Sequence, residues 1–317
     1  MLDNIPTFTS VFKNELKELI IFKRSMGYKY SDKYIRNFVI LDNFFNSMNL
    51  TKKEITEDIY NKWCQQKENE SINNFAYRYY KLKVFIDYLR QNNYNNIYFK
   101  ELNIKQQVQI SIHIFSGQEF EEILYFIDHY DYKSLSEKQS IPVIFRMLYS
   151  CGFRISEVLD LKIGDVDLVN GTITVSKGKN YVTRCIPISD SLLCVLKDYL
   201  DNKSSRLDDY LFVNNENNKF TYYNVYKIFK SSIDKYNKIN NKTIKTRLHD
   251  LRHSFITNSY KKLIGLNYNT YNALLLISKY VGHKGIKEVE YYIKAVNLED
   301  NIFSTNYTKD LFGDQNE

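Results

Sequence analysis

Residues 247–255 read RLHDLRHSF, and no other stretch of similar length says as much about the chain. On a helix, His249 and Arg252 share a face because they are three residues apart, and His253 lies one step round. One imidazole and one guanidinium are therefore presented to a common point. A helix whose histidines merely bond their neighbours would have the same pattern, so the interpretation depends on other segments.

In two further segments a polar side chain follows closely after a glycine that ends a helix. In CGFRISEVLDLK, Arg154 directly follows a glycine-capped helix end and lies off the packing face of the next short helix. In YVGHKGIKEVEYYIKA, Gly282 ends a helix, His283 follows at once, and Tyr291 and Tyr292 come eight and nine residues after that histidine. Three separate segments therefore carry groups suited to chemistry on an anion.

Length and composition bound the class of protein. The chain has 317 residues, 44% of them hydrophobic and 26% charged, which fits one large or two ordinary globular domains and excludes a collagen-like or wholly disordered chain. No apolar run approaches the roughly 18 residues of a membrane helix, and the first residues lack the features of a secretion signal. We expect a soluble cytoplasmic protein with no membrane partner.

The cysteines agree with that expectation. The chain contains four of them, without CxxC spacing, in segments that otherwise read as helix or strand: Cys64, Cys151, Cys185 and Cys194. We expect all four to be reduced, buried thiols.

Periodicity predicts a mainly α fold of the α+β type. Apolar residues recur at helical spacing from residue 8 to about residue 98, and residues 103–115 carry no helical period. Ser116 is placed to cap the next helix. Farther on, GTITVS and TRCIPI alternate in the manner of strands around a polar turn, which predicts a β-hairpin and hence a small antiparallel sheet.

These patterns divide the chain into four parts. The division comprises an N-terminal helical domain (1–105), a linker (106–115), a mostly helical second domain with the small sheet (116–300) and a C-terminal tail (301–317).

Basic residues gather in the second domain. Residues 219–262 hold eleven Lys or Arg but only two acidic residues, Asp234 and Asp250, and they are interleaved with Tyr and Phe. A polyanion partner would explain this distribution. A solvated lysine-rich surface would explain it as well.

Taken together, Arg154, the HDLRHSF box, and a Gly-His pair followed nine residues on by Tyr292 resemble the tyrosine recombinase family, the lambda-integrase type of site-specific DNA recombinase. The order, the spacing and the lysine-bearing hairpin between the boxes all agree. The resemblance covers nearly the whole chain and implies a SAM-like core-binding domain of four or five helices, followed by a catalytic domain with the DNA breaking-rejoining enzyme fold. The interval from His249 to His283 is 34 residues, and its ending, ISKYVGH, is similar to the transposon-associated branch.

The resemblance implies a role for each matching residue. Arg154 and Arg252 would clamp the scissile phosphate, His249 would act as base, Lys177 as general acid, His283 as hydrogen-bond donor and Tyr292 as nucleophile. The chemistry suits these residue types, because guanidinium stays charged at any ordinary pH and binds phosphate oxygens in pairs. A tyrosine phenol, with an ordinary pKa of about 10, needs a base as it attacks.

Two of these assignments stay open, and two further residues would have supporting roles. Lys179 is as cationic as Lys177, which is preferred because the family's lysine usually begins its Lys-Gly turn. Tyr291 adjoins Tyr292, and the spacing from His283 favours Tyr292. The supporting residues are Glu157, which would orient active-site side chains, and His253. The candidates for DNA contact are Lys179, Lys242, Lys245 and Arg247.

The resemblance also implies partners. The first is double-stranded DNA. The second is the chain itself, as a homo-tetramer on two recombination sites that exchanges C-terminal segments in trans. Accessory DNA-bending proteins are further candidates. No metal, ATP or other cofactor is expected. The setting would be the bacterial cytoplasm, with the protein on the nucleoid when it is bound to DNA, and the role would be integration or transposition of a mobile genetic element.

Two other classes of function fit parts of the sequence. His249, His253 and His283 could bind zinc in a hydrolase, but the helix lacks the HExxH glutamate and Arg252 would repel a cation. A catalytically silent DNA-binding accessory protein is the other alternative, although all six expected catalytic positions carry competent side chains.

Overall fold

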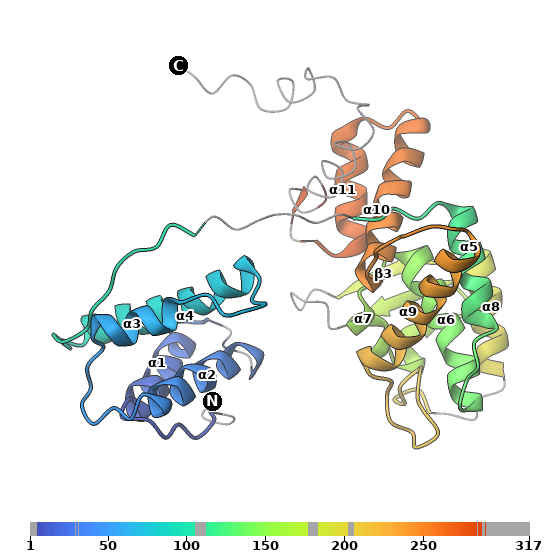
Figure 1. The fold of residues 1–317 in the computed structure, drawn as a ribbon. Helices are drawn as coiled ribbons and strands as arrows, with labels where there is room; N and C mark the ends of the chain where they lie inside the picture. The colour runs from blue at the N-terminus through green and yellow to red at the C-terminus, as the bar shows by residue number, and fades with distance from the viewer. Residues whose placement is uncertain are drawn as a thin grey trace, which may run out of the picture. The chain divides into compact units, whose positions relative to one another are not determined.

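The chain forms two compact units, residues 1–110 and 111–317, and each has its own hydrophobic core (Figure 1). The computed structural model describes residues 5–28, 30, 32–104, 112–176, 183–201, 206–283, 285, 286 and 289. Helices dominate both units, and one small antiparallel sheet lies in the second. The expected fold class, mainly α with a small antiparallel sheet, is confirmed.

The helices of the first unit are α1 (Lys13–Ser25), α2 (Asp32–Ser47), α3 (Glu57–Cys64) and α4 (Ile72–Gln91). Thr56 and Ser71 cap α3 and α4, because their hydroxyls accept hydrogen bonds from backbone N–H groups of the first turn. The core is aromatic: the ring of Phe12 packs against Phe45 and Phe85, with centroids 4.8 and 5.5 Å apart. Removing one such buried ring typically costs about 3–5 kcal/mol of stability.

The second unit contains the remaining elements in the order α5 (Gly117–Asp128), α6 (Leu135–Cys151), α7 (Ile155–Leu159), the 3-10 helix η1 (Ile163–Asp165), β1 (Val166–Asp167), β2 (Thr172–Val175), β3 (Arg184–Pro187), α8 (Asp190–Asp201), α9 (Tyr222–Ile239), α10 (Leu248–Gly265) and α11 (Thr270–Val281). Ser116 caps α5 as expected, because its hydroxyl accepts from the N–H of Glu119.

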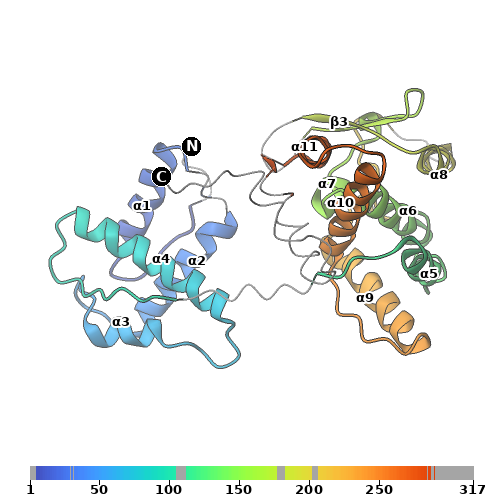
Figure 2. The ribbon, with the colours of Figure 1, turned by 90° about the horizontal axis from the view of Figure 1, so that it is seen from above.

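Helix α6 is the centre of this unit. It packs against α5, α8 and α10, as Figure 2 shows from above, and most of its residues from Ser140 to Cys151 are buried. The sheet runs in the order β1-β2-β3, and its longer pair is the hairpin expected from GTITVS and TRCIPI. Helices α10 and α11 pack against each other around a smaller core that includes Ile256 and Ile277.

Phe115 belongs to the second unit although the sequence placed it in the linker 106–115. Its side chain is fully buried, and its backbone N–H donates to the Ser254 hydroxyl of α10 at 2.9 Å. This contact joins the segment before α5 to the helix that carries the HDLRHSF box.

The expectation for the cysteines is wrong for two of them. Cys151 is buried and Cys64 is half-buried, but Cys185 and Cys194 are exposed. Alternation along β3 turns Cys185 away from the face that holds Ile186, and Cys194 lies on the outer side of α8. A cysteine within a strand or helix is thus not buried unless it lies on the inner face.

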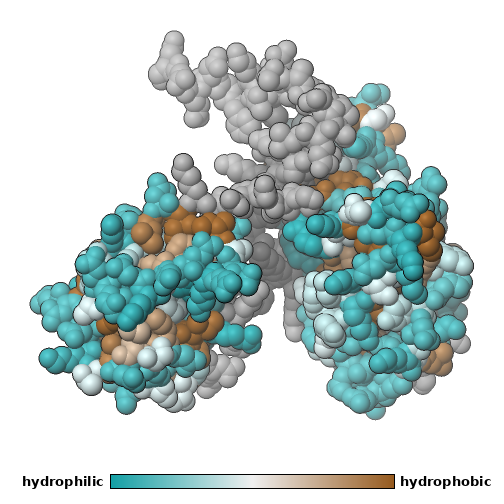
Figure 3. Space-filling model, in the orientation of Figure 1, coloured by the Kyte–Doolittle hydropathy of each residue, from teal (hydrophilic) through white to brown (hydrophobic). Residues whose placement is uncertain are grey.

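The visible surfaces of both units are mainly hydrophilic, with smaller apolar patches (Figure 3). Within the described part of the chain, we find no helix with the length and apolar character that a membrane crossing requires.

Candidate active site

The end of α6 positions the first arginine. Gly152 adopts a left-handed conformation (φ 61°) that stops the helix, and Arg154 then forms the N-cap of α7. A side chain at position 152 would collide with the Phe255 ring of α10. Glycine is therefore required for two reasons, the backbone angle and the close approach of α10 to this turn.

Arg252 is buried between two helix ends. Its Nη1 donates to the carbonyl oxygen of Gly152 and its Nη2 to that of Val281, each at 2.7 Å, and only 1% of its side chain is exposed. The last carbonyls of a helix lack backbone partners and carry partial negative charge, so they suit a cation. One arginine thus joins the C-terminal ends of α6 and α11 to α10.

Glu157 binds Arg154 through two hydrogen bonds. The carboxylate accepts from the Arg154 backbone N–H at 3.0 Å and from its Nη1 at 2.8 Å, while Nη1 of Arg252 lies 3.9 Å away. Burial would raise the pKa of Glu157, but the bonds and charges of Arg184 and Arg154 outweigh it and the pKa falls below its ordinary value. The supporting role expected for Glu157 stays a prediction.

Arg184 is the site residue that the sequence reasoning missed. Its Nη1 and Nη2 donate to the two carboxylate oxygens of Glu157 at 3.2 and 2.8 Å, and its Nε donates to the carbonyl oxygen of Tyr280 at 3.1 Å. The available signal was the alternation of TRCIPI, which puts Arg184 on the same face as the buried Ile186. An arginine on the inner face of a strand needs a buried partner.

The three histidines share the electrostatic environment of these arginines. Burial lowers the pKa of His283 to about 3, with further lowering by Arg252, Arg154 and His249. Although part of its ring remains exposed, the protein atoms around His249 lower its pKa to about 4, and Arg252 and Arg154 add to the shift. Arg252 donates to the carbonyl oxygens of Gly152 and Val281, which precede Arg154 and His283 by two residues each. Since His249 lies about one turn before Arg252 on α10, the four side chains lie in one neighbourhood.

His253 packs beside His249 rather than facing the same way. Their rings meet edge to face with centroids 4.7 Å apart, and Nε2 of His253 lies 3.9 Å from a carboxylate oxygen of Asp250. Burial lowers the pKa of His253 to about 3, helped by the neighbouring His249 and Arg247. All three imidazoles are therefore neutral at pH 7.

The candidates for DNA contact that the structure describes lie around the start of α10. Lys242 donates to the Tyr236 hydroxyl at 2.6 Å, and Lys245 is exposed. Arg247 donates to Asp250 at 2.8 Å, and Asp250 also accepts from the Arg247 backbone N–H. Lys242 and Arg247 thus have protein partners, whereas Lys245 lies open to solvent.

Three expected site residues lie outside the described residues: Lys177, Lys179 and Tyr292. The same holds for Tyr291, the alternative nucleophile. Strands β2 and β3 are described on either side of residues 177–182.

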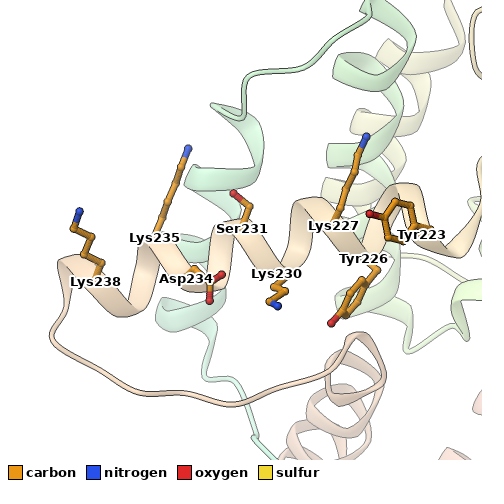
Figure 4. Close-up of a pocket in the computed structure, with 8 residues that line it drawn as sticks. All are labelled: Tyr223, Tyr226, Lys227, Lys230, Ser231, Asp234, Lys235 and Lys238. Carbon is orange, nitrogen blue, oxygen red and sulfur yellow. The ribbon is translucent and has the colours of Figure 1, made fainter.

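A second basic feature runs along α9. An open groove there is lined by lysines and tyrosines, together with a serine and an aspartate: Tyr223, Tyr226, Lys227, Lys230, Ser231, Asp234, Lys235 and Lys238. Figure 4 shows Lys227 and Lys235 extending from one side of the helix and Lys230 and Tyr226 from the other. Lys227 lies 3.5 Å from Glu137, whereas Lys230, Lys235 and Lys238 are exposed.

Among the described residues, no three His, Cys, Asp or Glu side chains gather in a way that could hold a metal ion. The histidines considered as a zinc set are instead accompanied by Arg252 and Arg154, which lower the pKa of both His249 and His283.

Comparison with known proteins gives a consistent result. Residues 114–298 match the family model described as the phage integrase family. The tyrosine recombinase XerA of Pyrococcus furiosus is 32% identical over 178 residues, which cover 54% of this chain and 56% of that protein. The tyrosine recombinase XerD of Staphylococcus haemolyticus is 29% identical over 154 residues, 47% of this chain and 48% of that protein. The chain thus spans about half the length of the curated relatives it matches.

Solved structures share the fold over most of the chain. The XerH recombinase bound to a palindromic difH substrate superposes with a TM-score of 0.63 at 20% identity, covering 91% of this chain and 84% of that one. The Tn1549 transposon integrase in complex with transposon right end DNA gives a TM-score of 0.65 at 15% identity, covering 90% and 98%. At these identities the likeness concerns the fold.

Proposed function

We propose that this chain, which belongs to the phage integrase family, is a site-specific DNA recombinase that cuts and rejoins duplex DNA through a covalent 3′-phosphotyrosyl intermediate. The observation that carries the proposal is the gathering of Arg154, Arg252, His249 and His283 in one electrostatic neighbourhood. These residues come from the start of α7, from α10 and from the end of α11. Such a set of side chains suits a phosphodiester.

The arginines would supply the charge. In-line displacement at phosphorus spreads negative charge over the non-bridging oxygens and the leaving oxygen. Arg154 and Arg252 would neutralise that charge at all ordinary pH values. Both are already oriented by protein contacts, Arg154 by Glu157 and Arg252 by two helix-end carbonyls, so little reorganisation is needed when the phosphate binds.

The low pKa values of the histidines favour distinct roles for the neutral rings. A neutral imidazole has one nitrogen that accepts and one that donates. His249 could therefore take the proton of the attacking phenol, and His283 could donate a hydrogen bond to a phosphate oxygen. His253, packed edge to face on His249, would hold that ring in place.

The remaining roles follow the family resemblance. Tyr292 would attack phosphorus and expel the 5′ oxygen of the DNA, and Lys177 would deliver a proton to that leaving oxygen. The 5′ hydroxyl of the partner strand would then attack the phosphotyrosyl ester, which rejoins the DNA and releases Tyr292. The phosphotyrosyl bond conserves the energy of the phosphodiester bond that is broken, so rejoining would need no ATP. The two arginines would take the place of a metal ion. Lys179 and Tyr291 remain the alternatives at these two positions.

The partners are proposed on the same basis. Double-stranded DNA would be bound by the core-binding domain (1–105) and the catalytic domain (116–300), with Lys245 and the α9 groove as phosphate contacts. Four copies would assemble on two sites and exchange C-terminal segments in trans, assisted by DNA-bending proteins. The setting would be the bacterial cytoplasm and nucleoid, and the role integration or transposition of a mobile element.

A covalent-trapping assay tests the function. The full chain is incubated with nicked suicide duplexes tiled across the DNA that flanks its gene, and protein–DNA adducts are separated under denaturing conditions. We expect an adduct that forms in EDTA and disappears in Tyr292→Phe. DNA binding without any adduct would favour the accessory-protein alternative, and loss of activity with the chelator would favour a metal-dependent hydrolase.

A further inference from the structure

Arg184 is bound on all three nitrogens by protein oxygens. Two of its bonds form a fork onto Glu157, and the third reaches the Tyr280 carbonyl. Its side chain is 9% exposed and that of Glu157 only 2%. Through these bonds Nε, Nη1 and Nη2 of Arg184 link Glu157 to the last turn of α11.

The carboxylate that Arg184 holds is the one that orients Arg154. Each of the two Glu157 oxygens accepts hydrogen bonds from both arginines, and Nη1 of Arg252 lies 3.9 Å from the carboxylate. A buried carboxylate that loses a partner is left under-compensated. Without the fork of Arg184, Glu157 would be free to shift toward Arg154 and Arg252 and to draw their guanidiniums away from a phosphate.

The second contact of Arg184 supports the turn before His283. The Tyr280 carbonyl belongs to the last turn of α11, and Gly282 follows in a left-handed conformation (φ 69°). A Cβ atom at position 282 would lie only 2.8 Å from Nη1 of Arg184. The guanidinium therefore packs directly against the backbone of this turn, next to His283.

We propose that Arg184 is a positioning residue, which couples strand β3 to α7 and to the end of α11 and thereby sets the orientation of Arg154 and His283. The inference rests on the proposed function, because its consequence is a rate of DNA cleavage. Arg184 would act through Glu157 and the last turn of α11.

The geometry requires arginine and not simply a positive charge. A guanidinium presents a planar fork that matches both carboxylate oxygens and still offers Nε in another direction, whereas an ammonium is a point charge on a flexible stem. Arg184→Lys would retain the charge beside Glu157 but could not keep the fork and the Tyr280 contact together.

The chain offers a matched control. Arg146 on α6 forms the same kind of fork with Asp128, at 2.9 and 2.8 Å, and also donates to the Pro142 carbonyl. No active-site residue takes part in that group. Arg146→Lys therefore measures what the loss of an arginine fork does to the domain in general.

The experiment compares Arg184→Lys, Gly282→Ala and Arg146→Lys in the full chain. The measurements are single-turnover cleavage at saturating concentrations of the suicide duplex that traps the wild type best, affinity for the same duplex, and the thermal midpoint. We expect cleavage to fall about 100-fold in Arg184→Lys and Gly282→Ala, with affinity within about threefold of wild type, because small misplacement of catalytic groups costs rates of that order. Arg146→Lys should cleave as the wild type does.

A second measurement tests the positioning role of Arg184 without depending on DNA cleavage. We expect the ring resonances of His283 in NMR spectra of the folded chain to move in Arg184→Lys and in Gly282→Ala but not in Arg146→Lys. Wild-type cleavage by Arg184→Lys would overturn the inference and leave the proposed function intact. If the wild type traps no DNA, the function fails, and unmoved His283 resonances would then overturn the positioning role as well.

Discussion

Arg252 on α10 donates a 2.7 Å hydrogen bond to the carbonyl oxygen of Val281, the last residue of α11. Val281 precedes His283 by two residues, so this single contact ties the HDLRHSF box to the Gly-His pair. Nη1 of Arg252 donates to the carbonyl oxygen of Gly152, two residues before Arg154. The three boxes read from the sequence are joined through one buried side chain.

The two arginines should therefore behave differently when removed. Arg154→Ala and Arg252→Ala should each lower the cleavage rate by about 100-fold to 1,000-fold, because phosphate charge loses its partner. Only Arg252→Ala should also lower the thermal midpoint markedly, since it leaves two buried carbonyl groups without their donor. Trapping assays and thermal melts on both variants check this, and equal stability of the two would contradict it.

The nucleophile can be tested with the loss of one oxygen atom. Tyr292→Phe should abolish the covalent adduct and leave DNA affinity within about twofold, because only the hydroxyl is removed. Tyr291→Phe is the matched control and should keep the adduct. The opposite pattern in the denaturing gel would move the nucleophile to Tyr291.

The histidines predict a particular pH dependence of stability. Their folded pKa values, about 4 for His249 and about 3 for His253 and His283, lie below the ordinary value near 6.5. Between pH 6.5 and 4 the unfolded chain binds more protons than the folded one. The contribution of these histidines to the free energy of unfolding is therefore fully present above pH 6.5 and is lost as the pH is lowered through this window. Thermal midpoints measured from pH 8 to 4 should show the decline.

A variant isolates this contribution. His253→Gln removes a buried titrating ring and should reduce the pH dependence of the thermal midpoint between pH 6.5 and 4. A slope that is identical in wild type and His253→Gln would rule out His253 as its source.

The α9 groove predicts a salt-dependent contribution to DNA affinity. Lys230→Gln and Lys238→Gln should each weaken binding to duplexes of any sequence and reduce the slope of log affinity against log salt by roughly one. Lys197→Gln on α8 is a suitable control, because that helix also carries Asp190, Asp198 and Asp201. Unchanged slopes in the α9 variants would exclude this face from DNA contact.

Replacing Gly152 should change the stability of the second unit without changing its charge. Gly152→Ala should destabilise the second unit by about 2 kcal/mol or more, through the left-handed backbone and the collision with Phe255. Denaturant unfolding measures it. Phe255→Ala should remove part of the penalty in the double variant, and an additive result would show that the ring is not the obstacle.

Local patterns were sufficient for much of this molecule. The cap at Ser116, the helix ends at Gly152 and Gly282, and the hairpin around residues 177–182 depend on near neighbours in the chain, so they could be read from short stretches. The ordered boxes around Arg154, Arg252 and His283 pointed to the family because their types and spacings are set by the phosphate they would hold.

Long-range contacts could not be read in the same way. The bonds from Arg252 to Gly152 and from Arg184 to Tyr280 join residues 100 and 96 positions apart, and no local period encodes such partners. The exposure of Cys185 and the burial of Phe115 likewise depend on which face meets another element. Chain packing selects these partners through close fit and the need to pair buried charge, and those requirements act only when distant segments come together.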